Sequence, residues 1–141
     1  MNLKLVSFAD SGNLERERVV LKAAEDADVG DYTALCSSTT VPNTANPGLS
    51  VAFWFPSAKV KKDDIVVLYT KHGKQSKKRI GGGHTAYFFY WGVANPIWNA
   101  STSALVLIES ADWTIEWPAE TVEPEEPKKP SPNVPAAPPS K

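Results

Sequence analysis

Cysteine and histidine are scarce in this sequence of 141 residues, which contains one cysteine and two histidines. Because Cys36 stands alone, a disulfide within the chain and a zinc site built from several cysteines are both excluded. A buried, apolar role is expected for this side chain. We therefore expect no metal and no other cofactor.

Neither sign of charge is in excess. The chain has 15 lysine and arginine residues against 16 aspartate and glutamate residues, which gives a formal net charge of −1. No overall field therefore attracts nucleic acid or an anionic membrane surface, and an anionic partner has to be met by a local patch. We expect no membrane partner.

Long apolar runs are also missing. The apolar stretch at residues 3–9 is too short and too soon interrupted to be the core of a signal peptide. No run has the length of a transmembrane helix. These observations predict a cytoplasmic protein, or a component of a virion if the structural alternative given below holds.

Residues 118–141 differ in composition from the rest of the chain. They contain 8 of the 12 prolines and no aromatic residue, so they cannot bury a hydrophobic core. Glutamates come first and lysines follow, as in an extended linker with polyproline II character. The sequence therefore predicts one domain at residues 1–117 and a disordered Pro-rich tail or linker at residues 118–141.

Short apolar or β-branched runs, each bounded by turn residues, fill the first 117 residues, and no segment has a sustained helical period. This pattern is typical of an all-β sandwich or barrel. The candidate strands are residues 3–8, 18–23, 32–37, 50–55, 65–70, 85–91, 104–109 and 113–117. Eight strands of this length fit an antiparallel double sheet.

Alternation within these strands predicts which side chains point into the core. Three sets repeat with a period of two: Val19 and Leu21; Val51, Phe53 and Phe55; and Ile65, Val67 and Tyr69. Residues 105–108 are continuously apolar, which predicts a central strand that is covered on both faces.

The order of several segments resembles the lamin tail domain, an immunoglobulin-like β-sandwich. An acidic residue precedes a core-x-core strand at residues 17–23, and a Gly-x-aromatic-x-Leu strand follows at 30–35. An aromatic residue, a proline, a polar turn and an apolar strand come next at 51–69, and a Trp-Asn, polar turn and apolar strand close the pattern at 97–108. The resemblance implies an immunoglobulin-like antiparallel β-sandwich and a non-catalytic interaction module with variable partners. It implies no active-site residues.

One long connection, residues 71–84, has almost no apolar content but carries five fixed positive charges and both histidines. Long loops on rigid β scaffolds often bind ligands, and consecutive glycines let backbone amides approach an anion. Phosphate, nucleic acid or an acidic protein surface would suit such a loop. Trp98 would add an interface anchor if it were exposed beside the loop. The predicted ligand-binding residues are Lys71, His72, Lys74, Lys77, Lys78, Arg79, Gly81, Gly82, Gly83, His84 and Trp98.

Simpler interpretations of the same residues stay open. A solvated hairpin tip has the same composition, with lysine for solubility and glycine for flexibility. The two histidines, twelve residues apart, lack the spacing of metal ligands, and Cys36 lies at a strand end where a structural role explains it. Tyr87 and Tyr90 would stack on nucleic-acid bases only if they faced outward.

The leading hypothesis is therefore a binding module that is not an enzyme and that contacts a protein partner or an anionic ligand, such as nucleic acid. The second is a structural protein of a virion or another self-assembling complex, forming a homo-oligomer with the tail as a tether. An enzyme that uses Cys36 or the histidines ranks third.

Overall fold

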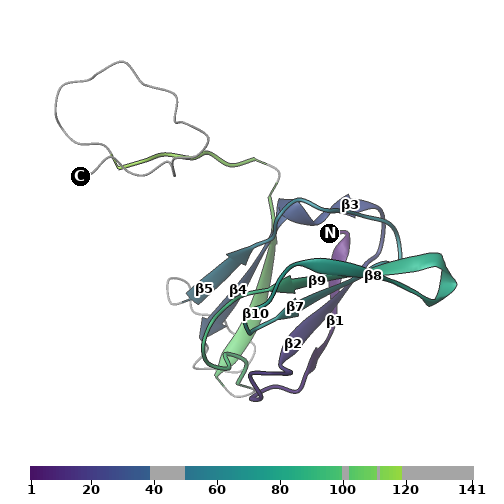
Figure 1. The fold of residues 1–141 in the computed structure, drawn as a ribbon. Helices are drawn as coiled ribbons and strands as arrows, with labels where there is room; N and C mark the ends of the chain where they lie inside the picture. The colour runs from purple at the N-terminus through teal and green to yellow at the C-terminus, as the bar shows by residue number, and fades with distance from the viewer. Residues whose placement is uncertain (39–49, 100–101, 111, 119–141) are drawn as a thin grey trace. The chain divides into compact units, whose positions relative to one another are not determined.

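The structure, a computed structural model, describes residues 1–38, 50–99, 102–110 and 112–118. Ten β-strands and two short 3₁₀ turns, Val29–Asp31 and Gly81–Gly83, make up its regular structure (Figure 1). The prediction of an all-β fold is confirmed. In the part of the chain that is described, no helix has the length and hydropathy needed to cross a bilayer.

Five strands form the larger sheet. They are β1 (Leu3–Ala9), β2 (Arg18–Ala23), β7 (Ile65–Tyr69), β8 (Ser76–Ile80) and β9 (His84–Tyr90). Their order is β1-β2-β7-β9-β8, so β1 and β8 lie at the edges. All neighbours are antiparallel except β7 and β9, which run parallel. The β7–β9 pair departs from the otherwise antiparallel pattern, because the chain crosses over the end of β9 to form β8 before it returns.

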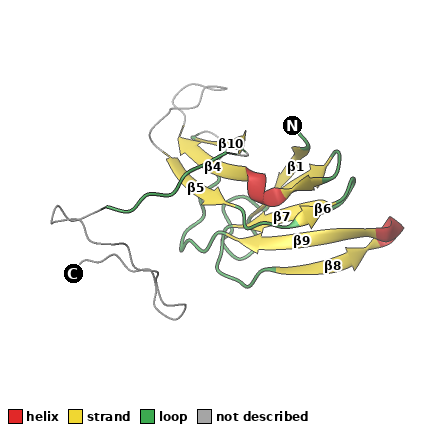
Figure 2. Cartoon of the chain, turned by 90° about the horizontal axis from the view of Figure 1, so that it is seen from above, coloured by secondary structure: helices red, strands yellow, loops and turns green. Residues whose placement is uncertain are grey.

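Three strands form the second sheet, in the order β10-β4-β5. They are β4 (Tyr32–Ser38), β5 (Ser50–Trp54) and β10 (Ser103–Glu109). A two-residue ribbon pairs β3 (Ala27–Asp28) with β6 (Lys59–Val60). Figure 2 shows the β10-β4-β5 layer apart from the layer that contains β7, β8 and β9.

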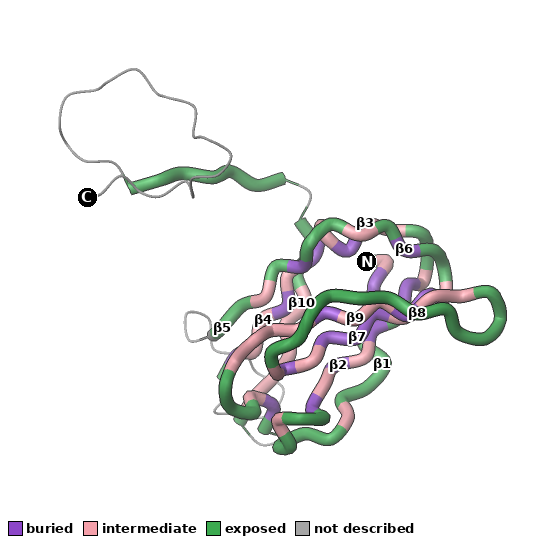
Figure 3. The backbone as a smooth tube through the Cα atoms, in the orientation of Figure 1, coloured by how far each residue is buried: buried purple, intermediate pink, exposed green. Residues whose placement is uncertain are grey.

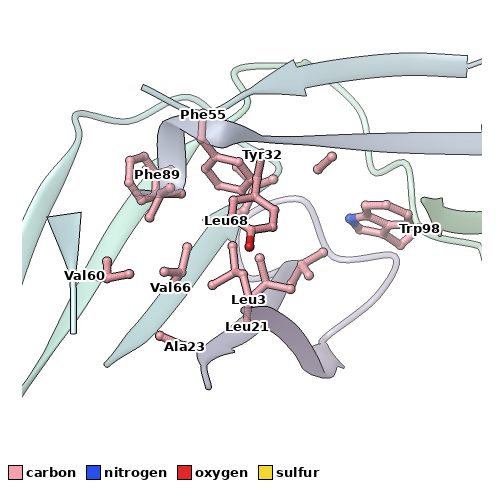
Figure 4. Packing of buried hydrophobic residues seen from close by; sticks show 13 residues of the cluster. Leu3, Leu21, Ala23, Tyr32, Phe55, Val60, Val66, Leu68, Phe89 and Trp98 are labelled. Carbon is pink, nitrogen blue, oxygen red and sulfur yellow. The ribbon is translucent and has the colours of Figure 1, made fainter. Parts of the chain in front are cut away.

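The core lies between the two larger sheets and takes side chains from both (Figure 4). Leu21, Val66 and Leu68 come from the five-stranded sheet, and Tyr32 comes from β4. A series of aromatic contacts also crosses this core, with ring centroids 5.1 to 6.1 Å apart, through Phe89, Phe55, Phe53, Trp91, Trp98 and Phe8. Edge-to-face pairs of this kind stabilise a core beyond the area that they bury.

Two of the predicted core sets need correction. In β7 the fully buried side chains are Val66 and Leu68, which belong to the face opposite to the predicted one. Every residue of this central strand is apolar or aromatic, so alternation could not identify the inner face. In the second set Phe55 is buried, but Val51 is 48% exposed.

Strand β10 is an edge strand, whereas the sequence predicted a central one. Leu105 and Leu107 pack against the core, and Ile108 is exposed. The continuous apolar run therefore covers one face of an edge instead of two faces of a central strand.

The compact β unit comprises Met1–Ala111, and Asp112–Lys141 is separate from it. The predicted last strand, residues 113–117, does not form: the described residues 112–118 contain no regular structure and are exposed. The alternation of Trp113, Ile115 and Trp117 is typical of a strand, but in the structure these side chains are exposed. The tail predicted at residues 118–141 lies almost entirely outside the described residues.

Candidate functional site

The basic segment at residues 71–84 is the best candidate site, and it is more ordered than a loop. Ser76–Ile80 forms strand β8, which pairs with β9 from Ser76 opposite Phe88 to Ile80 opposite His84. The prediction of one long loop is therefore wrong. A strand forms here because the ladder with β9 supplies its hydrogen bonds, although its sequence has no apolar alternation.

The connection from β7 to β8 crosses the end of β9. A Cβ atom added at Gly73 would lie 2.3 Å from the ring of Tyr90, so only glycine allows the backbone this close to the ring. His72 packs nearby, with its ring 3.4 Å from the position of a Cβ atom on Gly92. The crossover is thus held against the end of the sheet.

The three consecutive glycines form the turn between β8 and β9. Gly82 and Gly83 have φ angles of 76° and 79°, in the left-handed region that other residues rarely adopt. The turn lies at the far end of the β8–β9 ribbon, away from the other strands (Figures 1 and 2). The backbone of the turn therefore explains Gly82 and Gly83, whereas Gly81 has neither a positive φ nor a close neighbour that would require glycine.

Strand β8 presents cations on both faces of the sheet. All five of its residues are exposed, as the continuous green along β8 shows in Figure 3. Because side chains alternate along a strand, Lys77 and Arg79 lie on one face and Lys78 lies on the other. With Lys74 in the crossover, this makes four positive charges within six residues.

Four other cations of the fold are ion-paired, whereas Lys4, Arg16, Lys61 and Lys62 form no ion pair with any described residue. Arg18, Lys22, Lys59 and Lys71 each lie within 4.0 Å of a carboxylate, at distances of 2.9 to 3.9 Å. In contrast, none of Lys74, Lys77, Lys78 and Arg79 forms an ion pair with any residue that the structure describes. We call these four residues the β8 cation group.

Aromatic rings near the β8 cation group are already occupied. Tyr90 stacks on Tyr69 with centroids 5.3 Å apart, and Gly73 lies against the Tyr90 ring. Arg18 and Lys71 both lie over the ring of Tyr69. These rings leave little free surface for stacking on bases.

Tyr87 also does not face outward. Its ring packs against the core, and its hydroxyl donates a hydrogen bond to the carbonyl oxygen of Lys59 at 3.2 Å. Burial, with a further contribution from the charge of Asp64, raises the pKa of Tyr87.

The two histidines lie at opposite ends of β9. His84 begins the strand, with Nδ1 4.0 Å from Oδ1 of the buried Asp64, whereas His72 lies beside Gly92, beyond the other end. A seven-residue strand is roughly 20 Å long, so the two rings cannot share one ion. Within the described residues no group of three or more His, Cys, Asp or Glu side chains could hold a metal ion.

Trp98, which the sequence proposed as an interface anchor, is a core residue. It is 5% exposed and contacts Phe8 and Trp91 edge to face. Its buried Nε1 has no hydrogen-bond partner among the described residues. The condition for an anchor, exposure beside the basic segment, is not met.

Cys36 is partly buried, and its Sγ lies 3.4 Å from the carbonyl oxygen of Ile97, to which the thiol donates. Burial raises the pKa of Cys36, and the charge of Glu17 adds to the effect. The thiol is therefore protonated at neutral pH, and a protonated thiol is a poor nucleophile.

Glu17, like Asp64, is a buried charged residue, and the sequence did not single it out as a candidate functional residue. Its Oε1 accepts from the amide of Gly12 at 2.7 Å, and its Oε2 accepts from Thr70 Oγ1 at 2.6 Å and from the amide of Ile97 at 2.9 Å. The carboxylate thus joins three segments that are far apart in the sequence. The only feature of the sequence that could have indicated this role is the position of Glu17 directly before β2, in the segment that resembles the lamin tail domain.

Asp28 has a similar structural role at the β3–β6 ribbon. Its carboxylate accepts from the amides of Gly30 and Ala58 and from the hydroxyl of Ser57. Burial alone would raise its pKa, but these hydrogen bonds, with a smaller contribution from Lys59, outweigh burial, and the pKa of Asp28 lies below its ordinary value.

No model of a known protein family matches the chain, and a search of curated proteins finds no match either. The resemblance to the lamin tail domain therefore stays a prediction from the sequence.

Proposed function

We propose that this protein is a non-catalytic binding module that contacts an anionic partner through the β8 cation group. The observation that supports it most directly is that Lys74, Lys77, Lys78 and Arg79 lie within six residues, in a segment that contains no acidic residue, and that none of them forms an ion pair with a described residue. A phosphate-bearing ligand, nucleic acid or an acidic protein surface supplies the missing charge.

Repulsion within the β8 cation group gives a physical reason for binding. Lys77 and Arg79 are two residues apart on one face, roughly 7 Å in an extended strand, so their repulsion in water is roughly 0.6 kcal/mol before screening by salt. Residues 71–84 contain no acid to relieve it. An anionic partner removes this repulsion and gains the attraction of several charges at once.

Lysine on an edge strand also discourages pairing with other sheets. This explains a charged edge, but it does not require cations on both faces and in the crossover as well. The two roles predict different behaviour with a polyanion, because edge protection needs no affinity.

Heparin retention of the full chain tests the proposal. One variant replaces the β8 cation group with glutamine. The control variant replaces Arg18, Lys22, Lys59 and Lys71 with glutamine, which removes the same number of charges from ion-paired positions. We expect the first variant to elute at much lower salt than the wild type and the control to elute close to it. If both variants lost heparin retention equally, net charge alone would explain the retention, and the proposed site would be rejected.

A second function, as a subunit of a self-assembling complex, is supported by edge strand β1. Leu5, Val6 and Phe8 on this strand are 44%, 55% and 40% exposed. Exposed apolar side chains on an unpaired edge are typical of a surface that pairs with another chain. Light scattering after gel filtration tests it: a stable oligomer that Val6→Lys dissociates would favour assembly, and a monomer at all concentrations would reject it.

A further inference from the structure

Strand β8 has an unpaired backbone edge as well as unpaired charges. In the described sheet it pairs with β9 on one side and has no neighbour on the other. The hydrogen bonds of β9 show which residues of β8 turn outward. The amide of Thr85 donates to Asp64 Oδ1 and the amide of Trp91 donates to the carbonyl of Tyr69, so the odd-numbered residues of β9 turn their amides away from β8.

The register between β8 and β9 then shows which backbone N–H and C=O groups of β8 face away from β9. Lys77 lies opposite Tyr87 and Arg79 lies opposite Thr85. In an antiparallel pair the two residues of a non-hydrogen-bonded position both turn their amides and carbonyls away from each other. Lys77 and Arg79 therefore offer their N–H and C=O groups at the outer edge, while Lys78 is bonded to Ala86.

The same three residues limit what can occupy this edge. A second copy of β8 would place lysine or arginine against lysine or arginine, and like charges directly opposite each other destabilise a sheet. A segment with acidic side chains at three successive positions would meet Lys77 and Arg79 on one face and Lys78 on the other. Charge thus disfavours self-pairing through β8 and favours an acidic segment.

Single-stranded nucleic acid fits the site less well. Such ligands are bound by stacking their bases on aromatic rings beside a basic groove. Here Tyr69 and Tyr90 stack on each other, and Tyr87 packs against the core. A partner that uses the backbone edge takes fuller advantage of what β8 offers.

We propose that β8 binds an acidic peptide segment in extended conformation, which adds to the five-stranded sheet as a further antiparallel strand. This inference rests on the proposed function and names its class of partner. The segment exchanges main-chain hydrogen bonds with Lys77 and Arg79 and places acidic side chains opposite Lys77, Lys78 and Arg79. Such strand addition draws affinity from the main chain and specificity from the side chains.

Three capped peptides test the proposal with the full-length protein. The first, Thr-Val-Glu-Glu-Glu-Val-Thr, has the three acids. The second carries glutamine in place of glutamate. The third keeps the glutamates but is N-methylated at two adjacent central residues, which removes one amide donor from each edge. We expect the second and third peptides to bind at least about tenfold more weakly than the first, because the second loses three opposite-charge pairs and the third loses ladder hydrogen bonds.

Amide hydrogen exchange supplies a second readout with residue resolution. Binding of the first peptide should slow exchange at the amides of Lys77 and Arg79 and leave the amide of Lys78, already bonded to β9, nearly unchanged. An oligothymidylate of matched charge serves as the nucleic-acid probe and should bind more weakly and protect neither amide.

The outcomes separate this inference from the proposed function. Equal binding of the first and third peptides, or unchanged exchange at Lys77 and Arg79, would overturn strand addition while leaving an anion-binding site in place. Tighter binding of the oligothymidylate than of the first peptide would also overturn it. Failure of every anionic probe, together with unchanged heparin retention of the neutralised variant, would reject the proposed function itself.

Discussion

Replacement of Glu17 by alanine is expected to destabilise the β unit strongly. Three donors, from Gly12, Thr70 and Ile97, would lose their acceptor. A hydrogen bond to a charged group contributes about 1.5–3 kcal/mol, but losses at one carboxylate do not add fully, and water can reach the half-buried donors. We expect a loss of about 3–5 kcal/mol of unfolding free energy, a large part of the 5–15 kcal/mol typical of a domain.

Urea unfolding followed by tryptophan fluorescence measures this loss. With a slope of about 1.5 kcal/mol per molar urea, the midpoint should fall by about 2–3 M. Glu15→Ala is the matched control, because Glu15 is two residues away, exposed and paired with Lys71 only at the surface. Exposed ion pairs contribute about 0–1 kcal/mol, so this variant should unfold near the wild type.

The Glu17→Gln variant refines the test, because it keeps the shape of the side chain but replaces one acceptor oxygen with an NH₂ group. It should fall between the wild type and Glu17→Ala. A midpoint for Glu17→Ala within error of that for Glu15→Ala would refute the role given to the buried carboxylate.

Three further predictions concern the turn, the β3–β6 ribbon and the thiol. Gly82→Ala should weaken the hairpin by about 1 kcal/mol or more because of its positive φ, whereas Gly81→Ala should change it by less than about 0.5 kcal/mol; hydrogen exchange at Lys78 measures both. Asp28→Asn should destabilise the protein above pH 3.8, the ordinary pKa of the carboxyl. The difference in stability from the wild type should vanish as the pH falls through the lower pKa of the folded state. Urea midpoints of both proteins, measured between roughly pH 7 and pH 2, test this pH dependence. Cys36 should react with a disulfide reagent more slowly than glutathione at neutral pH, because its pKa is raised; an equal rate would contradict its buried setting.

Most strand positions could be predicted from the sequence because apolar runs and turn residues bound them. Strand β2 matches its prediction at both ends, and β1, β4, β7 and β10 differ by a residue or so. Strand β8 was missed because Ser-Lys-Lys-Arg-Ile has no apolar alternation, and it forms only through its ladder with β9. The opposite error occurs at residues 113–117, where a strand-like pattern forms no strand.

Burial was harder to predict than strand position. In β7 both faces are apolar, so the choice between Val66 and Val67 depends on which sheet packs on which side, and that is decided by distant segments. For Trp98, the sequence is compatible with either an exposed anchor or a core residue, because its burial also depends on how distant segments pack. The basic segment itself was identified from composition, but the absence of acidic partners and the free backbone edge are properties of the folded sheet.

The salt dependence of polyanion binding tests the central claim most directly. If the four residues of the β8 cation group each neutralise a phosphate of a DNA duplex used as a probe, log K should fall with log salt at a slope of roughly −3.6, or roughly 150-fold between about 50 and 200 mM salt. We predict that neutralising these four residues removes most of this slope and that neutralising Arg18, Lys22, Lys59 and Lys71 leaves most of it. The same slope in the wild type and in the variant without the β8 cation group would contradict the account.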